Sequence, residues 1–255
     1  FIGYHLSSYL LKKKFHVIGF DNLNPYYSIK LKNQRLKILK KFKNFEFHKL
    51  DISNKKKLSN LFKLHRLDII YHLSAQPGIM YSYKNPRSYK QNNILATKNL
   101  IELVKRNDNI KKFIFASSSS VYGKQNKYPI SEKFDLHPQN YYGKTKKICE
   151  DLIIKNLSNN KVKKYIIYRF FTVYGSFGRP DMFITGFRYR KKNSILNLYN
   201  YGNYERDFTY IDDIVKVLSK SIKNSDANNK IINICSGNPI RVKNLANLLE
   251  KKFKK

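Results

Sequence analysis

The chain has 255 residues, of which 42% are hydrophobic, and this is enough to build one α/β core with a small second lobe. Its formal net charge of +34 would ordinarily attract an anionic partner such as nucleic acid. Lysine is enriched in every segment together with Asn, Ile and Tyr, so we interpret the charge as a composition bias of solvent-exposed faces and expect no nucleic-acid partner. No uninterrupted apolar run approaches the roughly 20 residues of a membrane span, so we expect no membrane association either.

The pattern along the chain is one of apolar strand-like runs separated by longer helical stretches. The first residue is not Met, and 1–6 begins where a helix should already be starting, so we expect the first strand of the sheet to be missing. Strand-like runs follow at 15–20, 45–50, 68–73, 112–117 and 165–170. Helical stretches lie at 31–42, 55–64, 87–106 and 140–157. These crossovers are long enough to return each strand parallel to the last, which predicts a Rossmann-like, doubly wound parallel sheet.

The segment from about Met182 onward is less regular and richer in aromatic residues, which suits a smaller substrate lobe over the carboxyl ends of the strands. We therefore expect a dinucleotide-binding domain at 1–180 and a partial lobe at 181–255, interleaved with the first domain. Within the second part, 196–198 and 231–234 are strand-like. The basic helix at 245–255 stops without a capping glycine, so we expect the lobe to be truncated.

A ribose-binding carboxylate is indicated at the end of the first strand-like run. In a doubly wound sheet an acidic side chain about 20 residues after the glycine-rich turn binds the adenosine ribose, and Asp21 stands eighteen positions after Gly3. A carboxylate there repels the 2′-phosphate of NADP, so NAD is the expected cofactor. The alternative is that Asp21 only caps the following turn.

Tyr142 and Lys146 stand four positions apart, downstream of the serine run 117–120, and on a helix this spacing places both side chains on one face. A phenol has a reference pKa of about 10 and is a poor base at neutral pH, whereas a nearby ammonium lowers that pKa. The pair therefore predicts a proton shuttle in which Lys146 depresses the pKa of Tyr142.

The cysteines and histidines indicate neither a disulfide framework nor a metal site. Cys149 and Cys235 are far apart in the sequence, and the six histidines lack the spacing of metal ligands. A reducing, cytoplasmic location without a bound metal is expected.

Taken together, these motifs resemble the extended short-chain dehydrogenase/reductase superfamily, and the resemblance runs through nearly the whole chain. It is carried by 1–3, 21–24, 51–52, 72–75, 117–123, Tyr142-x-x-x-Lys146 and Arg206-Asp207. Within that superfamily, the runs at 21–27, 76–82, 169–175 and 178–182 are most similar to nucleotide-sugar 4-epimerases that act on UDP-glucuronate. UDP-glucose 4-epimerases are the near relatives.

The resemblance implies a role for each matching position. Tyr142 is the expected base at the sugar C4 hydroxyl, Lys146 binds the nicotinamide ribose, and Ser118 relays or holds the proton. The implied cofactor contacts are Ile2, Gly3, Asp21, Asn22, Asp51, Ile52, Leu73, Ala75, Asn93 and Phe171. The implied substrate contacts are Ser119, Ser120, Thr172, Arg179, Asn197, Tyr199 and Arg206. Taken singly, Asp51, Asn93 and Phe171 are also compatible with a purely structural role.

The implied reaction is epimerisation at C4 through a transient 4-keto sugar, with the cofactor regenerated. Related dehydratases and decarboxylases carry acidic residues where this chain has Ser119 and Ser120, which favours epimerisation. Together with Thr172, these hydroxyls could hold a substrate carboxylate, so UDP-glucuronate is favoured over UDP-glucose or UDP-galactose.

Other functions stay open, namely a non-catalytic NAD-binding module and a basic nucleic-acid-binding module. The resemblance also implies a homodimer formed through the helices that contain Arg87 and Asn140. Because the first strand and part of the lobe are expected to be missing, we expect the 255-residue chain alone to hold NAD weakly and to turn over little substrate.

Overall fold

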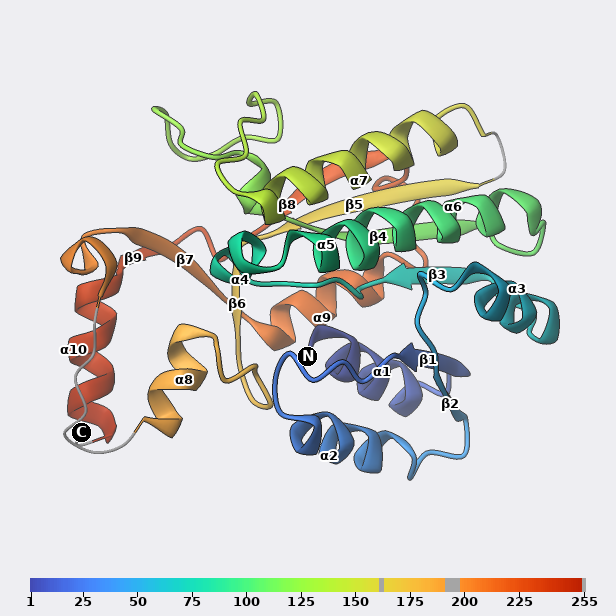
Figure 1. The fold of residues 1–255 in the computed structure, drawn as a ribbon, viewed down its shortest axis with the longest axis horizontal. Coiled ribbons are helices and arrows are strands. Elements are labelled where there is room, and N and C mark those ends of the chain that lie inside the picture. Colours follow the sequence, from blue (N-terminus) through green and yellow to red (C-terminus); the bar gives the residue numbers. More distant parts are fainter. Residues whose placement is uncertain (161–162, 191–197, 254–255) are drawn as a thin grey trace.

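The computed structural model describes residues 1–160, 163–190 and 198–253. Its centre is a four-stranded parallel sheet in the order β3-β4-β5-β8, and a second, two-stranded parallel sheet pairs β1 with β2 (Figure 1). The strands are β1 (Val17–Asp21), β2 (Phe45–Lys49), β3 (Ile69–His72), β4 (Lys112–Ser118), β5 (Lys164–Phe170) and β8 (Lys230–Ile234). The expected parallel, Rossmann-like sheet is therefore confirmed.

Helices cover both faces of this sheet because β4 and β5 are apolar on both sides. Phe113 and Phe115 of β4 belong to one core cluster and Ile114 and Ala116 to another, as the alternation of a strand requires. The first cluster is completed by α3 (Lys55–Leu64), α6 (Ala96–Arg106) and α7 (Tyr141–Leu157). The second is completed by α1 (Ile2–Lys12) and α9 (Ile211–Lys220). Removing each such apolar side chain from water contributes about 1.5–3 kcal/mol to the free energy of folding.

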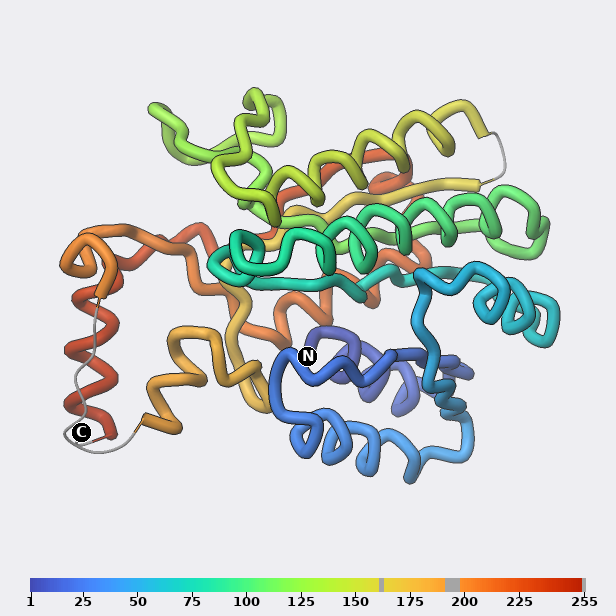
Figure 2. Tube along the Cα trace, in the orientation of Figure 1, coloured from blue at the N-terminus to red at the C-terminus, as the bar shows by residue number. Residues whose placement is uncertain are grey.

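A separate group of elements, which we call the C-terminal lobe, lies at one end of the molecule, away from α3 at the other end (Figures 1 and 2). It consists of α8 (Phe183–Tyr189), η3 (Tyr199–Gly202), β7 (Glu205–Tyr210), β9 (Pro239–Arg241) and α10 (Val242–Phe253). Phe187, Leu245 and Leu249 form its small core. β6 (Thr172–Tyr174) pairs with β7 and so joins the lobe to the end of β5.

One expected element differs from the structure, and another falls largely outside the described residues. The helix predicted at 87–106 is divided into α5 (Pro86–Tyr89), the π-helix η1 (Lys90–Leu95) and α6. The strand-like run at 196–198 lies largely outside the described residues. The remaining helices are α2 (Ile29–Leu39), α4 (Ile79–Lys84) and the short 3₁₀ turn η2 (Ser119–Val121). Within the described ranges, no helix has both the length and the apolar character needed to cross a membrane.

Candidate functional site

A cleft of about 1460 Å³ lies at the carboxyl ends of the parallel strands and is bordered on one side by the C-terminal lobe. Asp21 is the last residue of β1, Leu73 follows β3, and Ser118 ends β4, so three strands deliver side chains to one place. Most of the site residues expected from the sequence line this cleft. They are Ile2, Gly3, Asp21, Asn22, Asp51, Ile52, Leu73, Ala75, Ser118, Ser119, Ser120, Tyr142, Lys146, Phe171, Thr172, Arg179 and Arg206.

Of the three remaining expected site residues, Asn93 and Tyr199 do not line the cleft, and Asn197 lies outside the described residues. Tyr199 lies on η3 with 75% of its surface exposed. Asn93 is buried behind the cleft, and the proposed roles of all three stay predictions.

The side chain of Asn93 braces the cleft wall instead. Its Oδ1 accepts a hydrogen bond from the backbone N–H of Gln76 at 2.7 Å, and its Nδ2 donates to Thr145 Oγ1 at 2.9 Å. Asn93 lies in the π-helix η1, a local widening that is frequent at functional sites. In the structure, therefore, Asn93 ties a cleft-lining loop to α7.

The helix α7 begins at the cleft and carries both Tyr142 and Lys146 there. The Asn140 side chain caps its N-terminus by accepting a hydrogen bond from the Gly143 N–H at 2.8 Å. A Cβ on Gly143 would lie 2.5 Å from the Ser120 carbonyl oxygen, so only glycine allows the first turn to approach the serine loop this closely. The absence of a side chain at Gly143 therefore allows the first turn of α7 to pack directly against the Ser120 backbone.

The ammonium of Lys146 is almost completely buried. It is 3% exposed, and its Nζ donates a hydrogen bond to the Ala116 carbonyl oxygen at 2.6 Å. Burial lowers the pKa of Lys146 to about 8, because removal from water disfavours the charged form. The charged form of Lys146 is thus less favoured in the cleft than it is in water.

The electrostatics of Tyr142 correct the expectation from the sequence. Burial raises the pKa of the Tyr142 phenol, and the two groups that oppose this rise are the Arg179 guanidinium and a hydrogen bond with Ser118, not Lys146. The helical spacing correctly predicts that Tyr142 and Lys146 reach the same cleft. It gives no information about Arg179, which enters from a distant part of the chain.

Arg179 is a cation of the cleft whose guanidinium is only partly paired. Its Nη2 contacts the Met182 sulfur at 3.1 Å, and its Nε lies 3.5 Å from an Asp181 carboxylate oxygen. Its Nη1 is buried and has no hydrogen-bond partner among the described residues. A buried donor without a partner is costly, and an anionic group in the cleft could satisfy it.

The serine run forms a short polar turn at the end of β4. Ser118 caps η2 by accepting a hydrogen bond from the Ser120 N–H at 3.2 Å, and its own hydroxyl donates to Ser120 Oγ at 3.1 Å. Thr172 lies beside this turn on the cleft wall. The result is a cluster of neutral hydroxyl groups next to Tyr142, with no carboxylate on the turn itself.

The two loops that carry the expected adenosine-side residues are tied together. Asn22 Nδ2 donates to Asp51 Oδ2 at 3.2 Å, and Asp51 Oδ1 accepts from the Ser53 N–H and hydroxyl at 2.9 and 2.7 Å. Burial alone would raise the pKa of Asp51, but these hydrogen bonds outweigh it and lower that pKa. Asp51 therefore keeps its charge, and the N-terminus of α3 is capped by the side chain of Asn54.

The Asp21 carboxylate stays available at the end of β1. One of its oxygens accepts a hydrogen bond from the Leu23 N–H at 2.6 Å, and Lys32 Nζ lies 3.5 Å away. Nevertheless 48% of the Asp21 side chain is exposed. The capping interpretation and the ribose-binding interpretation are thus compatible with each other.

Below the cleft, a buried ion pair holds α7 to the sheet. Glu150 lies four residues after Lys146 on the same helix face and accepts hydrogen bonds from Arg169 Nε at 3.1 Å and Nη2 at 2.7 Å. The Ser117 hydroxyl also donates to Glu150, and Arg169 Nη1 donates to the Tyr122 hydroxyl at 2.9 Å. This pair was not expected from the sequence, although the four-residue spacing of Tyr142, Lys146 and Glu150 places all three on one helix face.

Other cleft residues appeared in the sequence only as members of the resembling runs. Tyr26 donates from its hydroxyl to Asp181 Oδ2 at 3.1 Å, which links the segment after β1 to the segment before α8 across the cleft. Gln76, which also belongs to one of these runs, and Tyr204, which belongs to none, line the cleft as well. Nothing in the local sequence distinguishes these side chains from ordinary surface residues.

Comparison with known proteins agrees with this geometry. An uncharacterised protein of Methanocaldococcus jannaschii is 42% identical over 262 aligned positions, which cover 100% of this chain and 78% of that protein. The UDP-glucuronate 4-epimerase of Thermodesulfobacterium geofontis is 38% identical over 256 positions, covering 98% and 77%. The crystal structure of UDP-glucuronic acid 4-epimerase from Bacillus cereus in complex with UDP-glucuronic acid and NAD matches with a TM-score of 0.92 and 34% identity, covering 100% and 81%.

The model of one protein family spans most of the chain. Residues 1–235 match the NAD dependent epimerase/dehydratase family. The match includes β1 through β8 and every residue named above for the proton shuttle. The chain therefore belongs to the NAD-dependent epimerase/dehydratase family.

Proposed function

We propose that this protein is an NAD-dependent 4-epimerase that interconverts UDP-glucuronate and UDP-galacturonate. The observation that carries the proposal is the position of Tyr142, which shares a cleft with Lys146 and hydrogen-bonds with Ser118. The two named UDP-glucuronate epimerases among the compared proteins supply the substrate class.

The residues of the cleft fit a bound NAD. A volume of about 1460 Å³ exceeds the range of about 300–1,000 Å³ typical of small-ligand pockets, so there is space for a dinucleotide beside a nucleotide sugar. The exposed carboxylate of Asp21 suits two ribose hydroxyls and repels a 2′-phosphate. Ile2, Gly3, Asn22, Asp51, Ile52, Leu73, Ala75 and Phe171 would line the path of the cofactor.

In the proposed reaction Tyr142 takes the proton from the C4 hydroxyl and later returns it. When bound, NAD supplies the hydride acceptor and donor that inversion at a secondary alcohol requires. Ser118 holds the proton on the phenol oxygen, and Lys146 orients the nicotinamide ribose. Because both the hydride and the proton return to the sugar, the net redox change is zero and no external reductant is needed.

Charge and hydroxyl placement favour a substrate that carries a carboxylate. Ser119, Ser120 and Thr172 offer neutral hydroxyls next to Tyr142, and Arg179 brings a buried guanidinium nitrogen without a partner among the described residues. A sugar carboxylate beside these groups would gain charge-assisted hydrogen bonds. We assign Arg206, which is exposed on β7 and lines the same cleft, to the diphosphate.

A direct assay tests the proposal. The full-length protein is incubated with UDP-glucuronate and, separately, with UDP-glucose, and the C4 epimers are separated by chromatography. Formation of UDP-galacturonate from UDP-glucuronate is the expected result. If only UDP-glucose is converted, the protein is a UDP-glucose 4-epimerase instead. If neither sugar gives a C4 epimer, the proposal is contradicted.

We also propose a homodimer formed through α7 and the helical segment of α5, η1 and α6, which contains Arg87. Apolar side chains are exposed on η1 and α7 and on the neighbouring α4, with Leu95 at 43%, Ile148 at 40% and Tyr83 at 62%. Burial of such side chains against a second copy would remove them from water. In light-scattering measurements, Ile148→Glu should therefore lower the molar mass to that of one chain. A matched control is Leu64→Glu, which changes a leucine that is 77% exposed on α3. A wild-type molar mass of one chain would contradict the dimer.

We also propose that the chain is divided into two parts near residue 180. Residues 1–180 would hold the cofactor, and 181–255 would contribute a partial lobe over the substrate. The separate core of Phe187, Leu245 and Leu249 supports it, as does the return of α9 and β8 to the main body of the fold, which interleaves the two parts. Both cysteines are free thiols, which supports the proposed cytoplasmic location.

A further inference from the structure

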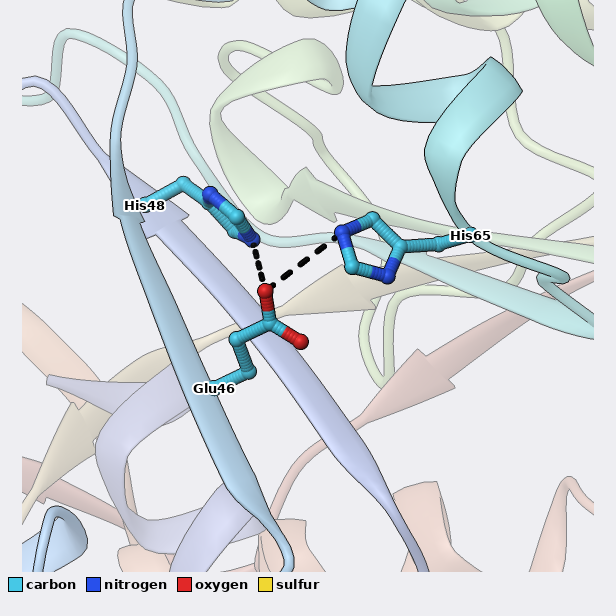
Figure 3. A group of neighbouring side chains, drawn as sticks. All are labelled: Glu46, His48 and His65. Carbon is cyan, nitrogen blue, oxygen red and sulfur yellow. Dashed lines mark ion pairs between the residues drawn. The ribbon is translucent and has the colours of Figure 1, made fainter.

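Three side chains that the proposed reaction does not use converge beside the edge of the two-stranded sheet (Figure 3). Glu46 and His48 are two positions apart on β2, so they point to the same face. His65 is the residue at which α3 ends. Folding alone brings it to the other two, which is why the spacing of histidines in the sequence gave no indication of a metal site.

The distances suit a small divalent ion. His48 Nε2 lies 2.7 Å and His65 Nε2 lies 3.5 Å from the same Glu46 carboxylate oxygen, and the three candidate ligand atoms all lie within 4.8 Å of one another. In a tetrahedral zinc site with bonds of about 2.0–2.1 Å, neighbouring ligand atoms are separated by about 3.3 Å. Small side-chain rotations would therefore place all three atoms around one ion.

The short contact between His48 and Glu46 is not a well-formed hydrogen bond. His48 Nε2 is buried and has no hydrogen-bond partner of acceptable geometry among the described residues, although a carboxylate oxygen lies 2.7 Å away. The rings of His48 and His65 are 5.2 Å apart and inclined at 64°, and both turn a nitrogen toward Glu46 (Figure 3). A metal ion would satisfy the lone pair of a neutral His48 in a way that this carboxylate alone does not.

We propose that Glu46, His48 and His65 form a binding site for Zn²⁺ or a divalent ion of similar preference, with water completing the coordination. Two imidazoles and one carboxylate are a donor set that zinc uses, whereas Mg²⁺ and Ca²⁺ prefer oxygen ligands only. Lys49 and Lys57 line a small neighbouring cavity and repel cations, so the affinity is lower than that of a site with several carboxylates.

The ion would cross-link β2 to the end of α3. The segment between these elements carries Asp51 and Ile52 into the cleft, and residues 46 and 65 enclose it. Metal binding should therefore stabilise the folded protein through a part of the chain that is distinct from the proposed proton shuttle. The inference does not depend on the proposed function.

The test uses tag-free protein in a Cys235→Ser background, because the exposed Cys235 thiol could itself bind zinc. After treatment with EDTA and removal of the chelator, ZnCl₂ is titrated by calorimetry, and the melting temperature is measured with and without zinc. We expect one equivalent of zinc to bind and the melting temperature to rise. When Co²⁺ is added in place of zinc, visible absorption bands typical of a low-symmetry, four-coordinate site should appear.

The variants separate this site from other zinc binding. His65→Asn and Glu46→Gln should lose the bound equivalent and the zinc-dependent rise, while their metal-free melting temperatures and circular dichroism show whether they fold. The matched control is His16→Asn, which changes an exposed histidine before β1 and should behave as the parent protein. Undiminished zinc binding in both folded site variants would overturn the proposal, as would absence of binding in the parent.

Discussion

Glu150 and Arg169 form a buried ion pair in which both side chains are almost fully removed from water, with 1% and 2% of their surfaces exposed. The pair connects the middle of α7 to β5. A charge buried without its partner is strongly destabilising, whereas a well-packed apolar replacement of both partners is often neutral.

Glu150→Ala should therefore lower the free energy of unfolding by about 3–5 kcal/mol, because it leaves the Arg169 guanidinium buried without its carboxylate. The double variant Glu150→Leu/Arg169→Met should recover most of that loss. Urea denaturation followed by circular dichroism measures both. A loss below about 1 kcal/mol in the single variant would mean that the pair contributes little.

The close approach of Gly143 to the serine loop gives a second prediction. In Gly143→Ala the new Cβ would clash with the Ser120 carbonyl oxygen, so we expect a loss of about 1–3 kcal/mol in stability. The matched control for stability is Gly3→Ala, whose Cβ would meet only Leu73 at an ordinary 3.8 Å. Equal melting temperatures for the two variants would show that α7 can shift without cost.

The buried amine of Lys146 links stability to pH. Burial lowers its pKa to about 8 from its ordinary value of 10.5, so between these pH values the unfolded chain binds the proton and the folded protein does not. Above about pH 10.5 the amine is neutral in both states, so its burial does not lower the free energy of unfolding. As the pH falls toward 8 that free energy decreases, and at pH 7 the folded protein bears the full cost of burying a charged Lys146.

Lys146→Met removes this cost and should raise the free energy of unfolding at pH 7 by about 1–3 kcal/mol, while turnover is lost. The difference between variant and wild type should shrink as the pH rises from 8 to 10, which chemical denaturation at several pH values can measure. The comparison with wild type cancels the titration of the other lysines. A difference that does not change with pH would contradict the assigned shift.

Arg179 gives a prediction for the pH dependence of the reaction. Because its guanidinium opposes the rise in the pKa of Tyr142, Arg179→Gln should raise that pKa. The acid limb of the pH profile of kcat/KM should then move to higher pH, since the reaction uses the phenolate. Arg66→Gln, at an exposed arginine after α3, is the matched control and should leave the profile in place. An unshifted limb in Arg179→Gln would indicate that another group controls it.

Local patterns in the sequence sufficed for the elements of the sheet, for the position of Asp21 at a strand end, and for the shared helix face of Tyr142 and Lys146. Each of these depends on residues that are close in the chain. The burial of Asn93, the ion pair of Glu150 with Arg169, and the meeting of His65 with Glu46 depend on packing between distant segments, which periodicity does not encode.

The electrostatics of Tyr142 show the same limit. Lys146 does lie in the cleft, as the helical spacing predicts. However, burial raises the pKa of Tyr142, and Arg179 from a distant loop opposes that rise. Helical spacing thus predicted which groups enter the cleft, whereas their protonation depends on how much water the complete fold excludes.

The most direct test of the central claim compares the full-length protein with its Tyr142→Phe variant in the conversion of UDP-glucuronate to UDP-galacturonate. Tyr9→Phe, at a tyrosine on α1 that does not line the cleft, is the matched control. We predict that Tyr142→Phe abolishes turnover while NAD still binds, and that Tyr9→Phe keeps wild-type turnover. Undiminished epimerisation by Tyr142→Phe would contradict the account.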